Sequence, residues 1–434
     1  MNQHAKRVAL IGAVALAVLA GGAVLGRPQP SAGPAPTPVA DAAPVDQLAA
    51  RIRSTQDRLR EVPGDWTAWA GLGLAYLEQS RVTSDPTYYP KAEQAVARSL
   101  SVRPKDNEAA LVARGAIANA RHDFVAARRD ALAVIRVNPY QADAYAVLAD
   151  AETQLGHPSA ATRAVQRLLD LRPGLPAYAR ASYDLELRGL TEPATALMRQ
   201  ALDAAVDGHD VAFCHVHLGE LALNAGDLDT AAAHYSAARS ADPHSIAARH
   251  GQARIAAARG RLADALAGFA ALTLRAPIPG YLLEYADLLA SAGRDREARQ
   301  QRELAATAHG LFTASGGTDG LTGAAIALAQ DRPAEAVRMA RDEWKRRQHA
   351  DVADMLGWAL HRAGDDREAI RYARLAVTSG ARSAPYAYHL GMISLGLGDR
   401  STAVAQLTRA LDLNPTFSPV DAPVARRTLT SLGA

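Results

Sequence analysis

The sequence predicts an all-α fold, an array of about ten helical hairpins with a single capping helix at each end. Three observations support this prediction. Hydrophobic residues make up 49% of the chain but aromatic residues only 5%, so the apolar content is mostly alanine and leucine, which favour packed helices over sheets. From Asp65 onward a similar helical motif recurs along the chain. The spacing between its copies is almost constant, which is typical of repeat architectures.

The amino-terminal segment, residues 1–26, is predicted to engage a membrane. Val8 to Gly26 are nineteen residues without a charge, and they follow a short basic stretch. As a helix they would span roughly 28 Å at ~1.5 Å per residue, close to a hydrocarbon core of ~30 Å. The residues from Ala20 to Gly22 also fit the cleavage site of a signal peptide. An uncleaved single-pass anchor and a cleaved signal both stay open. In either case the basic flank stays in the cytoplasm and the remainder is expected outside it, at the cell membrane or secreted.

Residues 27–44, "RPQPSAGPAPTPVADAAP", are predicted to be a linker. They contain six prolines and no large apolar side chain, so they cannot build a core. We expect an extended tether that reaches up to ~55 Å at ~3.1 Å per residue.

The repeating motif combines two helices whose crossing point carries little side chain. "WAGLGLAY", from Trp69 to Tyr76, has the spacing W-x-x-L-G-x-x-Y, and "HVHLGELALNAGD", "MLGWALHRAGD" and "YHLGMISLGLGD" follow the same plan. Two helices approach to ~8–10 Å only where the side chains between them are small. The small positions of the first helices are Gly73, Gly115, Ala149, Ser182, Gly219, Ala253, Ala286, Ala324, Gly357 and Gly391. The alanine positions of the second helices are Ala92, Ala127, Ala161, Ala194, Ala231, Ala265, Ala298, Ala336, Ala369 and Ala403.

The spacing of these positions is an independent check on the repeat. Small and alanine positions lie twelve residues apart in nine of the ten repeats, and successive small positions are 42, 34, 33, 37, 34, 33, 38, 33 and 34 residues apart. This pattern resembles the tetratricopeptide repeat family, whose period is 34 residues, over about Trp66 to Pro415. The resemblance implies a right-handed α-solenoid over residues 45–434 whose first helices line a concave groove. With the apolar segment at residues 1–26, we expect a bacterial member of this family that is membrane-anchored or secreted.

Glycine and proline mark where the helices are expected to end. A left-handed residue is needed after each first helix, and glycine adopts that conformation without strain. The glycines in this position are Gly156, Gly189, Gly226, Gly260, Gly293, Gly364 and Gly398. Proline cannot continue a helix, and prolines follow the second helices at Pro104, Pro139, Pro173, Pro243, Pro277 and Pro415.

Three segments break the period. An insertion loop is predicted between the helices of the first repeat, at residues 80–90, and shorter insertions lie in "AVDGHDV" and "HGLFTASGGTD". Single amphipathic helices before the first repeat and after the last are expected to cap the array, because terminal repeats need a polar outer face.

The stretch "HDVAFCHVHLGE" concentrates side chains that bind metals or perform catalysis. It holds the only cysteine of the chain. Cys214, His217 and Glu220 are spaced three residues apart and fit one helix face, so they form a possible set of three metal ligands. A buried small apolar cysteine in an ordinary repeat helix is the competing interpretation, and we prefer it.

Other chemical functions find little support in the sequence. The motifs H-E-x-x-H, G-x-x-x-x-G-K-[ST] and G-x-S-x-G do not occur, so no catalytic residue is assigned and an enzyme is not expected. Lys and Arg number 48 against 45 Asp and Glu, a net charge of +3, which argues against a nucleic-acid partner. No cofactor is expected.

The leading hypothesis is a non-enzymatic adaptor that binds a protein or peptide of unknown identity in its groove, outside the cytoplasmic membrane. Polar and aromatic residues of the first helices are the candidates for that contact, because Trp, Tyr and Arg are enriched at binding hot spots. They are Asp354, Trp358, His361, Arg362, Tyr388, Met392, Phe213, His217, Glu220, His250 and Arg254. The alternative is an extracytoplasmic metal-handling protein that uses Cys214, His217 and Glu220.

Overall fold

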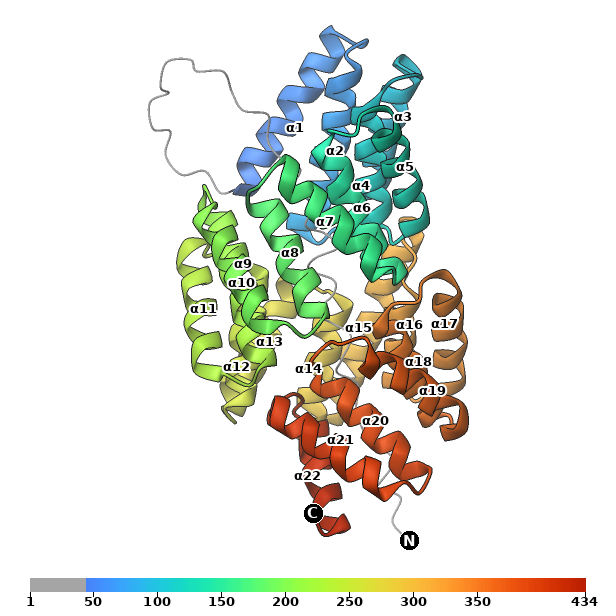
Figure 1. Cartoon of the computed structure of the whole chain (residues 1–434). Coiled ribbons are helices and arrows are strands. Elements are labelled where there is room, and N and C mark those ends of the chain that lie inside the picture. Colours follow the sequence, from blue (N-terminus) through green and yellow to red (C-terminus); the bar gives the residue numbers. More distant parts are fainter. Residues whose placement is uncertain (1–43) are drawn as a thin grey trace. The chain divides into compact units, whose positions relative to one another are not determined.

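The computed structural model describes residues 44–434, and this part of the chain consists of 22 helices with no strand (Figure 1). The predicted membrane segment at residues 1–26 and the linker up to residue 43 lie outside the described residues. Within the described part, no helix is both long and apolar enough to span a bilayer. Two compact units are present. The amino-terminal unit comprises residues 44–180 with 311–318, and the carboxy-terminal unit comprises 181–310 with 319–434.

The amino-terminal unit begins with a capping helix and continues with three hairpins. Its helices are α1 (Pro44–Glu61), α2 (Trp66–Thr83), α3 (Tyr88–Val102), α4 (Glu108–Ala120), α5 (Phe124–Val137), α6 (Ala142–Leu155) and α7 (Pro158–Leu171). Helices α2 and α3, α4 and α5, and α6 and α7 pack as pairs. Two further helices, α8 (Leu175–Leu187) and α15 (Asp295–Ala314), contribute residues to both units.

The carboxy-terminal unit contains the later hairpins and ends with a second capping helix. Its other helices are α9 (Thr191–Asp203), α10 (Gly208–Asn224), α11 (Leu228–Ala241), α12 (Ile246–Ala258), α13 (Leu262–Arg275), α14 (Pro279–Ser291), α16 (Gly320–Ala329), α17 (Pro333–Arg346), α18 (Ala350–Arg362), α19 (Asp366–Thr378), α20 (Ala384–Gly396), α21 (Arg400–Leu413) and α22 (Asp421–Leu432). Helices α10 and α11, α12 and α13, α16 and α17, α18 and α19, and α20 and α21 pack as pairs. The prediction of an all-α array of ten hairpins between two capping helices is confirmed.

The small and alanine positions meet at the helix crossings as predicted. All ten alanine positions are buried. At Gly73 an added Cβ would lie 2.6 Å from Val96 Cγ2, and at Gly357 it would lie 3.0 Å from the backbone nitrogen of Ala373. In the fourth repeat the small residue is Ser182, whose hydroxyl donates to the carbonyl of Ala194 at 2.7 Å. Close approach of the two backbones therefore selects the residue type at these positions.

The ends of the helices also follow the prediction. Each of the seven predicted glycines has a positive φ, between 72° and 88°. Each of the six prolines lies two residues beyond the last residue of a second helix. Three repeats use another residue at the left-handed position, Ser84 with φ 55°, His122 with φ 62° and Asp331 with φ 58°. Several first turns are capped by an aspartate, as at Asp399, whose carboxylate accepts from the Thr402 nitrogen at 3.0 Å.

The inserted residues mostly lengthen helices. Within the predicted loop at residues 80–90, α2 continues to Thr83 and α3 starts at Tyr88, so only four residues connect the helices. The insertion in "HGLFTASGGTD" extends α15 to 20 residues, and α10, after "AVDGHDV", has 17. Added turns satisfy their own backbone hydrogen bonds, which a long loop does not do.

Candidate functional site

We call the side of the array formed by the first helices of the repeats the inner face. Polar side chains of the first helices α10, α12 and α14 form a connected, largely buried set, which we call the polar ladder. Arg254 Nη1 donates to Glu220 Oε2 at 2.6 Å, and Arg254 Nε lies 3.8 Å from Glu284 Oε2. His250 Nε2 lies 2.9 Å from the same oxygen of Glu284. The hydroxyl of Tyr235, on α11, donates to Glu220 Oε1 at 2.7 Å. The ladder thus links three successive repeats.

Two glycines make room for the tyrosine at the base of the ladder. Tyr235 is completely buried, and a Cβ added at Gly219 would lie 2.8 Å from its ring carbon Cε1. An added Cβ at Gly251 would overlap the same ring. The absence of side chains at these two positions therefore lets a large ring enter a helix crossing and reach Glu220.

Burial and ion pairing act in opposite directions on the charges of the ladder. Burial alone would raise the pKa of Glu220, but Arg254, together with His250 and Tyr235, holds it below its usual value. The pKa of Glu284 is also lowered, by His250 and Arg254, against the effect of its burial. Burial would lower the pKa of Arg254, but Glu220 and Glu284 raise it. The two glutamates and the arginine are therefore ionised at neutral pH.

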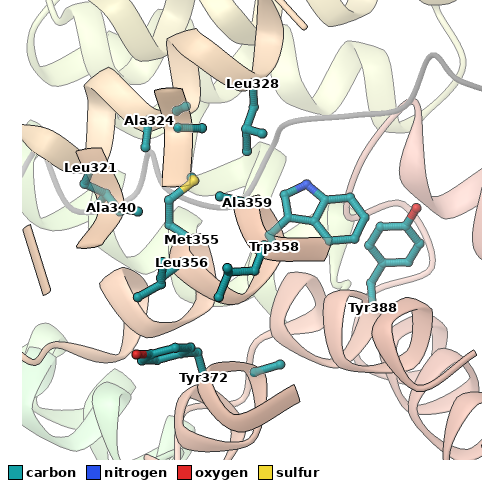
Figure 2. Packing of buried hydrophobic residues seen from close by; sticks show 14 of the residues in the cluster. Leu321, Ala324, Leu328, Ala340, Met355, Leu356, Trp358, Ala359, Tyr372 and Tyr388 are labelled. Atoms are coloured by element: carbon teal, nitrogen blue, oxygen red, sulfur yellow. The ribbon is translucent and has the colours of Figure 1, made fainter. Parts of the chain in front are cut away.

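A second inner-face group, the aromatic stack, joins α18 and α20. The Trp358 ring stacks on His389, with centroids 4.3 Å apart and planes at 18°, and on His361 at 4.9 Å. Tyr388 lies 5.8 Å from the Trp358 ring (Figure 2). His389 Nδ1 lies 2.9 Å from both carboxylate oxygens of Asp354. Trp358 is 2% exposed and Tyr388 is 0% exposed, so both rings belong to the core of the carboxy-terminal unit.

The candidate binding residues selected from the sequence fall into the two groups described above, and they differ in how exposed their side chains are. Glu220, His250 and Arg254 form part of the ladder, while Asp354, Trp358, His361 and Tyr388 lie in or beside the stack. The buried members are Asp354, Trp358, Tyr388, His217 and His250. The partly exposed members, which can touch another molecule without rearrangement, are His361, Arg362, Met392, Phe213, Glu220 and Arg254. Whether any of them binds a partner stays a prediction.

The possible metal ligands do not converge. Cys214 is completely buried, and its burial raises the pKa of the thiol to about 12. Burial lowers the pKa of His217 to about 4, and its ring packs edge-on to Phe213 at 4.4 Å. The two carboxylate oxygens of Glu220 accept hydrogen bonds from Tyr235 and Arg254. Among residues 44–434, no three His, Cys, Asp or Glu side chains are placed to hold one metal ion. The alternative prediction of a metal site at Cys214, His217 and Glu220 is wrong.

Several residues of these two groups and their surroundings were not selected from the sequence. They are Glu186, Glu284, Asp351, Tyr386 and His389 of the first helices, and Tyr235 of α11. Tyr386 donates its hydroxyl to Asp351 across α18 and α20. A usable signal was present in two cases: Glu284 is the single charge in "YLLEYA", and His389 interrupts the apolar run "YHLGMISL". A lone polar residue in an otherwise apolar helix face needs a partner when it is buried.

A comparison with protein-family models identifies one repeat of the chain. Residues 384–417, which contain α20 and α21, match the tetratricopeptide repeat family. A comparison with curated protein sequences found no match. The chain is similar to the structure titled APC/C hetero-tetramer Cut9-Hcn1, with 15% identity, TM-score 0.42 and coverage of 89% of this chain and 84% of that one. It is similar to the structure titled human IFIT1 dimer with PPP-AAAA, with 13% identity, TM-score 0.46 and coverage of 86% of this chain and 95% of that one. For a thermophilic TPR protein of Thermus thermophilus the values are 22% identity, TM-score 0.36 and coverage of 39% and 90%.

Proposed function

We propose that this chain, which carries a tetratricopeptide repeat at residues 384–417, is a non-enzymatic adaptor. In this proposal it binds a protein or peptide segment through the inner face of the carboxy-terminal unit. The amino-terminal apolar segment would hold or deliver it outside the cytoplasmic membrane, and the proline-rich linker would extend it from there.

One observation carries the proposal. The inner face keeps charged side chains partly exposed although their neighbours are buried. The side chains of Glu220 and Arg254 are 20% and 24% exposed, and those of His361 and Arg362 are 20% and 18% exposed. Such side chains are held in place by packing and ion pairs but still reach solvent. Because they are already ordered, they lose less conformational entropy when a partner binds.

Site-specific photo-crosslinking in the native cell tests the binding face. The full chain would carry the photo-reactive residue at Arg362 or Met392 on the inner face, or at the exposed outer positions Arg296 and Arg374. We expect the inner positions to capture one common protein that the outer positions do not capture. Capture from the outer positions alone, or from none of the four, would contradict the proposal.

The membrane part of the proposal has a separate test. An alkaline phosphatase fused after Ala434 is active only when it is exported, so activity would support an extracytoplasmic position. Membrane fractionation of the unfused chain then distinguishes a retained anchor from a cleaved signal. An inactive fusion that is stably produced would place the repeat array in the cytoplasm and remove this part of the proposal.

A further inference from the structure

In the amino-terminal unit, the end of α15 lies against the turn between α4 and α5. Residues 311–318 hold the last turn of α15 and the glycines after it, and they belong to this unit. The preceding part of α15 and the chain after Thr318 belong to the carboxy-terminal unit. The contact joins residues 195 positions apart. The segment therefore reaches this surface from a distant part of the chain, as a ligand would.

The end of α15 is a helix terminus closed by two glycines. Gly316 has a φ of 90°, and the nitrogen of Gly317 donates to the carbonyl oxygen of Phe312 at 3.0 Å. This is the hydrogen bond of a Schellman motif, in which the residue after the helix is left-handed. An added Cβ at Gly317 would overlap the Phe312 ring. The two glycines thus keep the ring and the end of the helix backbone close together.

Arg121, directly after α4, holds this helix end in two ways. Its Nε donates to the carbonyl oxygen of Gly316 at 2.8 Å, and its own carbonyl oxygen accepts from the Thr318 nitrogen at 3.0 Å. Glu93 on α3 pairs with the same guanidinium. A cation is favourable at the carboxyl end of a helix, because the last carbonyls carry partial negative charge. An added Cβ at Gly316 would overlap the guanidinium, so this contact requires glycine.

Aromatic rings on the same surface contact Phe312. The His122 ring lies 5.5 Å from the Phe312 ring, and the Tyr89 ring meets it edge-on at 6.1 Å. His122 in turn stacks on Phe124 at 5.4 Å. The side chain of Phe312 stays partly exposed. An aromatic side chain that packs against other rings at an accessible surface is typical of the anchors of protein interfaces.

Three residues of this contact are departures from the repeat. Tyr89 lies in the insertion of the first repeat, and Phe312 lies in the insertion "HGLFTASGGTD". His122 has a left-handed backbone with φ 62° where seven other repeats have glycine, and residues with a side chain are uncommon in that conformation. Packing within a hairpin does not require these departures, because hairpins that lack them adopt the same structure. They serve instead the contact between this surface and the helix end.

We propose that Tyr89, Glu93, Arg121 and His122 form a peptide-recognition site, the helix-end site, which the chain's own residues 311–318 occupy. Its ligand is the carboxyl end of a helix in a partner protein, with an aromatic residue in the last turn and a glycine four positions later. The partner binds by displacing the internal segment, which competes with it. The helix-end site lies in the amino-terminal unit, so it does not depend on the adaptor function proposed for the inner face of the carboxy-terminal unit.

A labelled peptide with the sequence of residues 303–319 tests recognition by the helix-end site. The released variant is the full chain with Phe312→Ala and Gly316→Ala, which removes the ring and places a methyl group against Arg121. Fluorescence anisotropy should show saturable binding of the peptide to the released variant. Binding to the wild type should be at least about tenfold weaker, because the tethered segment competes at an effective concentration of ~1 mM. No binding to a released variant that keeps its helical circular dichroism, or equal binding to both proteins, overturns the proposal.

Substitutions on both sides of the contact identify the recognised groups. In the released variant, Arg121→Met should weaken peptide binding at least about tenfold. Arg136→Met, at an exposed arginine in the last turn of α5, is the matched control and should leave binding unchanged. Peptides with Phe312→Ala or with Gly316→Ala should bind at least about tenfold more weakly than the natural sequence.

A milder variant keeps the test decisive if the released variant does not fold. The full chain with Phe312→Ala alone changes one partly exposed ring, and it should show the same order of affinities among peptides and Arg121 variants. Peptide binding that is insensitive to Arg121→Met and to both peptide substitutions overturns the helix-end site.

Discussion

The polar ladder and the aromatic stack connect first helices of neighbouring repeats through the same inner face, but they use different chemistry. In the ladder, Arg254 bridges Glu220 of the preceding repeat and Glu284 of the following repeat. In the stack, Trp358 packs against His389 of the next first helix. Glu220, Arg254 and Trp358 each directly follow the small residue of their repeat. One position of the repeat can therefore carry either an ion pair or a ring.

The difference between the two groups lies in what remains accessible. The ladder leaves part of Glu220 and Arg254 in contact with solvent, because charged groups lose hydration energy when they are fully buried. The stack buries Trp358 and Tyr388 completely or nearly so, since rings gain by leaving water. The ladder can therefore contact a partner as it stands, while the stack mainly holds α18 to α20.

Removing the central ring of the stack should have the largest effect on stability. Trp358→Ala deletes a buried indole and leaves a cavity, so we expect the free energy of unfolding to fall by about 3–5 kcal/mol. Urea unfolding of the full chain, followed by far-UV circular dichroism, measures the change. Tyr140→Ala, which truncates a 74%-exposed ring, serves as the control and should change it by less than about 0.5 kcal/mol. A stable Trp358→Ala variant that had lost its partner would instead make Trp358 a binding residue.

Removing the cation of the ladder should have a smaller and pH-dependent effect. Arg254→Met leaves Glu220 and Glu284 charged and facing each other, so we expect a loss of about 2–4 kcal/mol at pH 7. The pKa values of both glutamates are lowered in the wild type, with Arg254 as a cause in each case. The stability that this gives is present above about 4.5 and is lost as the pH falls. The difference in the free energy of unfolding between the variant and the wild type should therefore become smaller below that pH.

The matched control for the ladder is a surface pair. Arg259→Met breaks the ion pair between Arg259 and Asp229, whose side chains are 35% and 95% exposed. We expect this variant to lower the free energy of unfolding by no more than about 0.5 kcal/mol. The loss should not change with pH near 4.5. Equal losses in the Arg254 and Arg259 variants would mean that the ladder is no more than a set of surface pairs.

The sequence was sufficient for the fold because the repeat is specified by local chemistry. Each hairpin contains the residues that determine its own structure. They are a glycine or alanine at the helix crossing, a left-handed glycine and a proline two residues beyond a helix. Gly357 and Pro415 could each be assigned from their neighbours alone. The lengthened α2 and α15 were harder to predict, since added residues can extend a helix or form a loop with little difference in sequence.

The inner face could be predicted only in part because its partners lie in other repeats. Trp358 was selected as a side chain that its own hairpin did not need, but His389, which it stacks on, is 31 positions away. Glu186 is near Asp351, from a repeat much later in the chain. Such juxtapositions depend on how repeats follow one another in space, and a spacing pattern within one hairpin does not contain that information.

The space that holds the base of the ladder gives a third test. Gly251→Ala places a methyl group into the buried Tyr235 ring, so we expect a loss of about 1–3 kcal/mol from overpacking. Gly71→Ala adds the same methyl to an exposed helix position with nothing within 4 Å and should stabilise the chain by about 0.5–1 kcal/mol. Urea unfolding compares the two variants. If both stabilise the chain, Tyr235 moves easily and the glycines do not fix the ladder.

The smallest expected effect is at the edge of the stack, where backbone strain and charge can be separated. Asp331 holds a left-handed turn, with φ 58°, that glycine holds at Gly364 with φ 88°. Asp331→Gly should stabilise the chain by about 0.5 kcal/mol, because a side chain is strained in this conformation. Gly364→Ala should destabilise it by about 1 kcal/mol through backbone strain, since nothing lies within 4 Å of the added methyl.

The carboxylate of Asp331 is also 3.6 Å from Arg362, beside Trp358, but its side chain is 86% exposed, so the pair should contribute little. Asp331→Asn removes the charge and retains a residue that tolerates the turn. A loss of stability in both Asp331 variants would show that this charge supports the stack, and the contrast between a charged ladder and a stack held by its rings would no longer hold.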